Sequence, residues 1–391
     1  MNWTGKWMGY IPESATLRMF ELAKERESTG KRVYHFEVGQ PDFPTPRNII
    51  DAARNALELG HTGYTSARGI FELREAISET YLMHGHIDPK TQVIVTPGAK
   101  FALFASILSS IDPLREVLIL TPAWPSYLVM VRAARARPVV VPAGDDYHFD
   151  EEVLKSRLTP KTQGIIINTP NNPTGGILNK DAMKAISDIA EDYNLHVFSD
   201  EIYDKLIYTD EPITSMLDID PNLEHTVIIN GFSKSYSMTG WRLGYALSNP
   251  EVISNMVRIQ QNTTTCATSF VQYAGIEALR GPQDSIKRMV SEYKRRLDVV
   301  YKIVKSIDGV KVTKPKGTFY IFPDFSELGI EDKTFAEELL RETGVCTTPG
   351  SAFGEAGQGH LRISFSVSLE ELKVGLGLLK KYIEENVFAI S

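Results

Sequence analysis

The sequence has little cysteine and no strong excess of one charge. Its 391 residues include two cysteines, Cys266 and Cys346, far apart in the chain, so we expect neither a disulfide framework nor a metal site. Lysine and arginine together number 42 against 49 acidic residues, a net charge of −7, and no basic run is present. This balance argues against nucleic acid as a partner.

Long apolar runs are also missing. No stretch approaches the length of a membrane-spanning helix, and the N-terminal residues lack the apolar core of a secretory signal. We therefore expect a cytoplasmic protein that does not bind membranes. The hydrophobic share of 42% is enough for a sizeable core, and the length predicts a large domain with a smaller partner.

Short apolar runs alternate with segments of helical spacing in the middle of the chain. Residues 116–120, 164–168, 196–200 and 226–229 have the composition of buried strands, and 180–193 has helical spacing. Such alternation predicts an α/β fold, in which helices cover both faces of a mostly parallel central sheet.

The rest of the chain predicts a smaller α+β domain. One long helical stretch is expected from Pro250 to Arg280, where Gly281 and Pro282 end it. Further elements are expected as helices at 285–307, 334–342 and 369–385 and as strands at 317–322 and 360–366. The predicted parts are an N-terminal arm with part of the small domain (1–45), a large domain (46–280) and a small C-terminal domain (281–391).

Asn172, Asp200 and Lys234 each lie just past a predicted buried strand. Ligands bind beyond the carboxyl ends of the strands in such sheets, so topology brings these three side chains to one edge. Poor hydration should lower the pKa of Lys234 and free the neutral amine that a Schiff-base lysine needs. Simpler interpretations are a solvated loop for Lys234, a helix cap for Asp200 and a turn for Asn172.

A second pattern suits an anion. Residues 92–98 predict a strand that ends in a glycine, and a helix is expected to begin at the next residue. Free N–H groups at a helix N-terminus attract anions, so Gly98, Ala99 and Lys100 form a candidate phosphate cradle. Arg242, eight residues after Lys234, offers a guanidinium that suits a phosphate. An ordinary β–α turn is the alternative.

Four motifs give these residues a common context. They are VGQPDFPTP (38–46), NNPTGG (171–176), SDEIYDKLIY (199–208) and NGFSKSYSMTGWRLG (230–244). In this order, from about Gly39 to Arg362, the chain resembles the class I/II aminotransferases, which have a three-layer fold and bind pyridoxal 5′-phosphate (PLP). The resemblance implies ping-pong transfer of the amino group of an aspartate-type or aromatic L-amino acid to a 2-oxo acid such as 2-oxoglutarate. A PLP-dependent lyase on the same fold is the alternative.

The resemblance also implies roles around the cofactor ring. Lys234 would bind PLP covalently, and Asp200 would pair with the pyridinium nitrogen. Tyr203 would donate to the phenolic oxygen, and Trp124 would stack on the ring and face the substrate. Asn172 would bridge the phenolic oxygen and the substrate carboxylate.

Further implied roles concern the phosphate and the substrate. Ser233 and Arg242, with the cradle, would hold the phosphate, and Tyr64 would reach the phosphate bound by a neighbouring subunit. Arg362, an arginine in an apolar strand, would bind the substrate carboxylate through two hydrogen bonds beside Gly39. A shared tyrosine implies a homodimer with shared active sites.

No second cation for a dicarboxylic substrate is evident. The helix after Gly98 is expected to turn Phe104, Ile107 and Leu108 inward, which leaves room for aromatic or other apolar donors. An acidic side chain would then be accommodated through Lys100, Arg18 or water, and these alternatives stay open. The N-terminal arm, with Trp3, Trp7, Tyr10 and Ile11, is expected either to cover the partner subunit or to close over the substrate, where it would shape the pocket together with Phe43 and Phe353.

Overall fold

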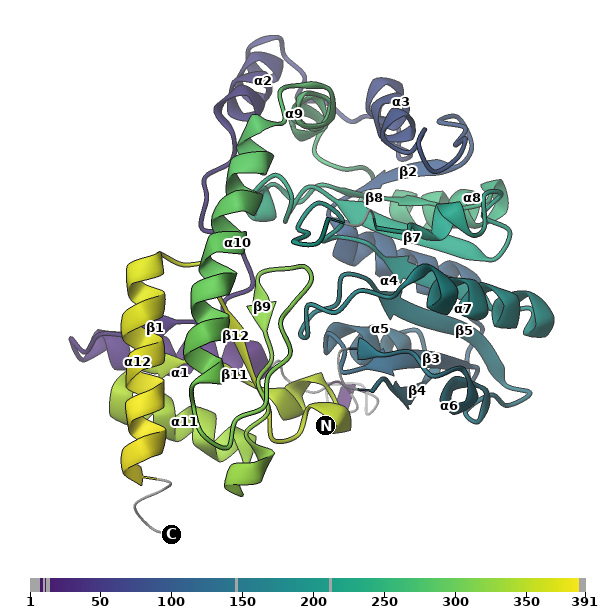
Figure 1. Cartoon of the computed structure of the whole chain (residues 1–391). Coiled ribbons are helices and arrows are strands. Elements are labelled where there is room, and N and C mark those ends of the chain that lie inside the picture. The colour runs from purple at the N-terminus through teal and green to yellow at the C-terminus, as the bar shows by residue number, and fades with distance from the viewer. Residues whose placement is uncertain (1–7, 10, 12–14, 145–146, 211–212, 387–391) are drawn as a thin grey trace, which may run out of the picture.

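The central sheet has seven strands in the order β2-β8-β7-β6-β5-β3-β4 (Figure 1). The structure is a computed structural model that describes residues 8–9, 11, 15–144, 147–210 and 213–386. The strands are β2 (Val93–Thr96), β3 (Glu116–Thr121), β4 (Arg137–Pro142), β5 (Thr162–Asn168), β6 (His196–Asp200), β7 (Thr226–Gly231) and β8 (Gly244–Leu247). Within this sheet β8 runs antiparallel to both neighbours, and the other neighbouring strands run parallel. The predicted mostly parallel sheet is confirmed.

Each central strand is buried on both faces. In β5, Ile166 belongs to one hydrophobic core, whereas Ile165 and Ile167 belong to the core on the opposite face. This split follows from the alternation of side chains along a strand, and it explains why the strands are continuously apolar in sequence. The helices that contribute to the first core are α4 (Ala99–Ser110), α5 (Ser126–Ala133) and α8 (Pro250–Gln261).

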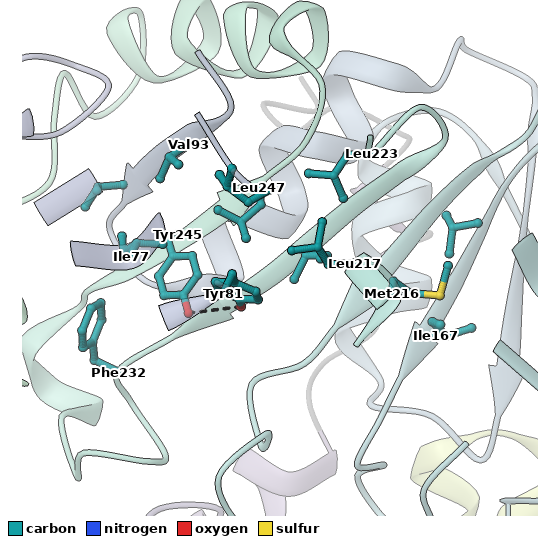
Figure 2. Close-up of a cluster of buried hydrophobic side chains, with 14 of the residues drawn as sticks. Ile77, Tyr81, Val93, Ile167, Met216, Leu217, Leu223, Phe232, Tyr245 and Leu247 are labelled. Atoms are coloured by element: carbon teal, nitrogen blue, oxygen red, sulfur yellow. Dashed lines mark hydrogen bonds between the residues drawn. The ribbon is translucent and has the colours of Figure 1, made fainter. Parts of the chain in front are cut away.

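The second core is closed by helices from both ends of the large sheet. They are α2 (Arg47–Glu58), α3 (Phe71–Thr80), α6 (Glu151–Lys155), α7 (Lys180–Tyr193) and α9 (Ser269–Arg280). Figure 2 shows part of this core, where Tyr81 and Tyr245 pack among aliphatic side chains and their hydroxyls lie 3.3 Å apart. The hydrogen bond gives the buried Tyr245 hydroxyl a partner, and the Tyr81 hydroxyl also accepts from Nδ2 of Asn230 at 3.3 Å.

A third core joins the N-terminal helix to the last third of the chain. It lies around the strand pair β1-β10 and the three-stranded sheet β11-β12-β9 (Figure 1). The strands are β1 (Tyr34–His35), β9 (Tyr320–Ile321), β10 (Val345–Cys346), β11 (Thr348–Pro349) and β12 (Leu361–Ser364). The helices are α1 (Ala15–Ser28), α10 (Asp284–Lys305), α11 (Asp332–Thr343) and α12 (Leu369–Asn386). The boundaries after residues 45 and 280 stay a prediction.

The prediction of one helix from Pro250 to Arg280 was wrong. The stretch forms α8 and α9, separated by residues 262–268, and Thr265 has a positive φ of 65°. Three consecutive threonines at 263–265 favour this interruption, because β-branched side chains lose rotamer freedom in a helix. Two strands are also shorter than predicted, since they span only Tyr320–Ile321 and Leu361–Ser364, while Gly317 and His360 form isolated bridges.

The predicted inward face of α4 was correct for Ile107 but wrong for Leu108. Its buried residues include Ala102, Leu103 and Ile107, whereas Leu108 is 39% exposed and Phe104 is half-buried. Leu103 and Ile107 face the core together with Ala102, whereas Phe104 packs at the edge of this core and Leu108 projects toward solvent. The absence of a basic residue at Leu108 therefore does not decide the substrate.

Candidate active site

A cavity of about 550 Å³ lies at the carboxyl ends of the central strands. Its lining includes Asn172, Asp200 and Lys234, which follow or end β5, β6 and β7, together with Tyr320 from β9 and Arg362 from β12. The parallel topology thus brings the three predicted strand-end residues together, and the smaller sheet supplies an arginine opposite them.

Asp200 is held in a fixed orientation at the end of β6. Its Oδ2 accepts a hydrogen bond of 2.7 Å from the hydroxyl of Tyr127, and its Oδ1 accepts one of 3.2 Å from the N–H of Ile202. Burial raises the pKa of Asp200 to about 6, although both hydrogen bonds oppose this shift. A cationic N–H placed against this carboxylate would stabilise its charged form.

Lys234 carries the amine best suited to covalent chemistry. It lies in the loop after β7, and its Nζ donates a hydrogen bond to the carbonyl of Gly39. Burial, together with the nearby charges of Arg362 and Arg242, lowers the pKa of Lys234 to about 8. Roughly a tenth of the amine is therefore neutral, and so nucleophilic, at pH 7, far more than for an ordinary lysine.

The N-terminus of α4 lies directly against the guanidinium of Arg242. Gly98 precedes the helix with φ of 89°, and a Cβ there would overlap with Nη2 of Arg242. Gly244 likewise has no room for a side chain, because a Cβ would overlap with the N–H of Ala99. Lys100 adds another charge, and burial beside Arg242 lowers its pKa. Concentrated positive charge at a helix N-terminus fits a phosphate group.

Arg362 has hydrogen-bonding capacity left over. It is 3% exposed, and its Nη1 donates to Oδ1 of Asn172 at 3.2 Å, while Nη2 donates to Oγ1 of Thr348 at 3.3 Å and to the carbonyl of Glu37. Within the described part of the chain, its buried Nε has no partner. Because an unsatisfied buried donor is costly, a carboxylate acceptor in the cavity would stabilise this arginine.

Comparison with known proteins agrees with this geometry. The family model of aminotransferase class I and II matches residues 31–379. The chain is 38% identical to aromatic-amino-acid aminotransferase 2 of Thermococcus litoralis, over 96% of this chain and 97% of that protein. It is 40% identical to an aspartate aminotransferase of Pyrococcus horikoshii, over 96% and 95% respectively. The chain belongs to the class I and II aminotransferases.

The fold of a solved relative leads to the same family. Aspartate aminotransferase of Thermus thermophilus with maleate superposes with a TM-score of 0.91, at 35% identity, over 97% of this chain and all of that one. The predicted activity of amino-group transfer and the predicted three-layer fold are confirmed, and the lyase alternative is not favoured. Enzymes of this family depend on PLP.

The cavity of this aminotransferase collects nearly all candidate site residues. Those that line it are Gly39, Ala99, Lys100, Trp124, Asn172, Asp200, Tyr203, Ser233, Lys234, Arg242 and Arg362. Gly98 lies beside it, against Arg242, whereas Tyr64 is 89% exposed and does not line the cavity of its own chain. The roles of these residues stay predictions.

Some residues expected at the substrate pocket lie elsewhere. Phe43 packs edge-on against Tyr293, and Phe353 is fully buried with its ring 5.1 Å from the Arg362 guanidinium, so neither lines the cavity. Arg18 pairs with Glu337 at 3.1 Å on the surface. Trp3, Trp7 and Tyr10 lie outside the described residues.

Tyr127 and Tyr320 are among the cavity residues that the sequence analysis did not identify. Tyr127, which binds Asp200, belongs to a stretch noted for Trp124, so its place after a strand was an available signal. Tyr320 offered no signal, because it is one aromatic residue in an apolar strand. In the ranges that the structure covers, no cluster of three or more His, Cys, Asp and Glu residues could hold a metal ion, and no helix has the length and apolarity to cross a membrane.

Proposed function

We propose that this aminotransferase binds PLP through Lys234 and transfers the amino group of acidic and aromatic amino acids to a 2-oxo acid such as 2-oxoglutarate. The observation that carries the proposal is the position of Lys234. Its amine, whose pKa is lowered to about 8, shares one cavity with Asp200, with the positive end of α4 beside Arg242, and with Arg362, whose buried Nε has no partner among the described residues. These groups match a ring nitrogen, a phosphate and a carboxylate respectively. When bound, PLP supplies the electron sink for bonds at the substrate Cα.

Asp200 and Tyr203 would control protons on the cofactor. Asp200, anchored by Tyr127, holds the proton on the ring nitrogen, because a buried carboxylate strongly favours a cationic partner. Burial holds the pKa of Tyr203 well above its usual value, so its hydroxyl stays protonated and can donate to the phenolic oxygen. Lys234 Nζ, once neutral, is the base placed to move a proton at the substrate Cα.

Arg362 and Asn172 would orient the substrate carboxylate. The guanidinium can turn its unpartnered Nε and one Nη toward the carboxylate, while Asn172 stays fixed by its N–H, which donates to Oδ1 of Asn168 at 2.8 Å. Asn168 in turn donates to the carbonyl of Asp200 at 2.9 Å. The carboxylate site and the ring-nitrogen site are therefore linked through one short chain of hydrogen bonds.

The substrate side chain would meet mixed surroundings. Leu17, Val38 and Leu103 give the cavity apolar surface, and Lys100 provides a cation whose Nζ lies 4.6 Å from the centroid of the Trp124 ring. Because Arg18 is paired with Glu337, Lys100 is the better candidate for an acidic side chain. The names of the two relatives, one aromatic and one aspartate aminotransferase, also favour a pocket that accepts both types.

The assembly would be a homodimer with shared active sites. Tyr64 is an almost fully exposed aromatic side chain, which is unfavourable in an isolated chain and suits contact with a second subunit. A tyrosine offered to the partner's phosphate would make each site incomplete without the other chain. Cytoplasmic localisation stays a prediction.

Absorbance of the purified protein and its reduction by borohydride would test the proposal. We expect a PLP band that shifts on adding aspartate or phenylalanine, and a reduced adduct that maps to Lys234. Lys234→Ala should abolish turnover, while Lys205→Ala, a partly buried lysine outside the cavity, should not. An adduct on another lysine, or release of pyruvate and ammonia in place of a new amino acid, would refute the proposal.

A further inference from the structure

Tyr320 makes three contacts inside the cavity, each with a group that the proposed function needs. Its hydroxyl lies 3.2 Å from that of Tyr203, and its ring lies 4.5 Å from the guanidinium of Arg362. A Cβ on Gly39 would lie 2.5 Å from the Tyr320 hydroxyl, so the backbone that accepts the Lys234 hydrogen bond packs directly on this oxygen. The Tyr320 side chain is 1% exposed.

The direction of the Tyr203–Tyr320 hydrogen bond follows from counting protons. A phenol has one O–H to donate and can accept as well. If the O–H of Tyr203 donates its hydrogen bond to the phenolic oxygen of PLP, then Tyr320 must be the donor in the hydrogen bond between the two tyrosines. Burial raises the pKa of Tyr320, which keeps this proton in place. A hydrogen bond received by Tyr203 polarises its own O–H and makes it a stronger donor.

The contact with Arg362 follows from the sheet register. Tyr320 in β9 pairs with Ser364 in β12, so Arg362 is its diagonal neighbour on the same face of an antiparallel pair. The tyrosine ring holds one side of the guanidinium by a cation–π contact, with the buried Phe353 ring at 5.1 Å. These contacts restrict the plane in which Arg362 can present its free N–H groups.

We propose that Tyr320 is a positioning residue for both the cofactor and the substrate. Its hydroxyl strengthens the hydrogen bond from Tyr203 to the cofactor, and its ring fixes Arg362 for the substrate carboxylate. This inference rests on the proposed function. Two substitutions test the hydroxyl and the ring of Tyr320 separately: phenylalanine removes the hydroxyl and keeps the ring, whereas leucine removes both.

The hydroxyl is tested by pH titration of the bound cofactor without substrate. Tyr320→Phe should raise the midpoint of the absorbance change by about 0.3 of a pKa unit, because cooperativity strengthens a hydrogen bond by roughly 10–30%. Tyr203→Phe should raise the midpoint more. In the Tyr203→Phe background, adding Tyr320→Phe should cause no further shift, because the route through Tyr203 is already lost. An equal shift in both backgrounds would overturn the proposal.

The ring is tested by binding of maleate, a dicarboxylate with no amino group to transfer. Tyr320→Phe should bind maleate within about twofold of the unmodified enzyme, whereas Tyr320→Leu should bind it roughly tenfold more weakly, as expected for a lost cation–π contact. Unchanged maleate affinity in Tyr320→Leu, with the cofactor still bound, would overturn the role of the ring.

Tyr208→Phe is the matched control. The hydroxyl of Tyr208 is buried in the same core and donates to the carbonyl of Thr318, but it does not line the cavity. Loss of this hydroxyl should lower Tm and leave both the titration midpoint and the maleate affinity unchanged. If either of them changes in Tyr208→Phe, the Tyr320 effects come from a general loss of packing in this core, and the proposal is wrong. If the unmodified protein shows no PLP band, the proposed function and the inference fall together. If the bound cofactor titrates and its midpoint shifts in Tyr203→Phe but not in Tyr320→Phe, the proposed function stands and only the inference is wrong.

Discussion

The hydroxyl of Tyr127 donates a 2.7 Å hydrogen bond to Oδ2 of Asp200, and both side chains are buried. This contact fixes the plane of the carboxylate without neutralising it. The pKa of about 6 reflects the cost of burying the charge in the cofactor-free enzyme. The charged form of Asp200 therefore suits binding of a cationic ring nitrogen but lowers the stability of the folded, cofactor-free protein.

Replacing Asp200 by asparagine should have opposite effects on stability and turnover. The folded pKa of about 6 lies above the usual 3.8, so the folded state binds more protons in this window and loses stability as pH rises through it. Cofactor-free Asp200→Asn should thus be more stable than the unmodified protein at pH 7, by at most about 3 kcal/mol, and similar below about pH 4. Urea unfolding at the two pH values measures this.

The loaded Asp200→Asn enzyme should lose several orders of magnitude in kcat. A neutral amide cannot hold the proton on the ring nitrogen, and each 1.36 kcal/mol of barrier is about tenfold in rate. Steady-state assays with matched cofactor occupancy measure the loss. Near-normal turnover would leave Asp200 with no role beyond its hydrogen bonds to Tyr127 and to the N–H of Ile202.

Attachment of PLP to the cofactor-free enzyme should follow the ionisation of Lys234. Burial, together with the charges of Arg362 and Arg242, lowers the pKa of Lys234 to about 8, so the rate should rise with pH and level off above this value. Arg362→Gln removes one of those charges and should move the midpoint upward, whereas Arg362→Lys keeps the charge and should not. Stopped-flow absorbance gives the rates. A midpoint identical in all three proteins would exclude this electrostatic coupling.

The sequence predicts the strand-end residues better than the walls of the cavity. Lys234, Asp200 and Asn172 could be placed together because parallel strands share one carboxyl edge, whatever the detailed packing. Tyr320 could not, since its hydrogen bond joins it to Tyr203, 117 positions away in the chain. The place of Tyr127 after a strand does not reveal its hydrogen bond to Asp200, 73 positions away. Which aromatic ring reaches a cavity depends on how two sheets pack, and no local pattern encodes this.

Local errors had local causes. The interruption at 262–268 was signalled by three consecutive threonines, but helical spacing on either side outweighed them. The inward face of α4 was misjudged at Leu108, because the helix carries large apolar residues on most sides and the face that packs on the sheet combines Leu103 and Ile107 with small residues such as Ala102. Apolar size is a poor guide where a helix is apolar on most sides.

Gly98→Ala should weaken cofactor binding through the phosphate. The new Cβ overlaps with the Arg242 guanidinium and forces it from the N-terminus of α4. Gly60→Ala is the matched control, because Gly60 has a similar φ of 81° with open space around it. Both variants should lose about 1 kcal/mol of stability from the positive φ. Only Gly98→Ala should release PLP more readily, which equilibrium dialysis measures; equal affinities would remove Gly98 from the cradle.

His35 should stabilise the fold in a pH-dependent way. Its protonated ring donates hydrogen bonds of 2.8 Å to buried Glu37 and 3.0 Å to Glu27, and the Glu37 contact, followed by that with Glu27, raises the pKa of His35 to about 9, against the effect of burial. The folded pKa is raised above 6.5, so the stabilisation is full below that value and is lost as pH rises through about 9. His35→Gln should cost about 1–2 kcal/mol near pH 6 and little near pH 10.

Unfolding in urea at both pH values measures the His35 effect, and NMR titration of the ring checks its cause. Glu37→Gln should return the pKa of His35 toward its ordinary value. The carbonyl of Glu37 accepts a hydrogen bond from Arg362. Loss of the His35–Glu37 pair should therefore also weaken the binding of maleate. A His35→Gln penalty of the same size at both pH values would contradict the charged pair.

Complementation between two inactive chains would decide whether Tyr64 serves the partner subunit. Tyr64→Leu should weaken PLP binding and Lys234→Ala should abolish turnover. In a hybrid dimer of the two, one site combines the intact Lys234 of the first chain with the intact Tyr64 of the second. At limiting PLP, random reassociation of the two variants should therefore restore roughly a quarter of the native sites. If Tyr64 acts within its own chain, no hybrid site is complete and mixing restores nothing. Sedimentation of the same samples establishes whether dimers form, and a fully active monomer would exclude shared sites.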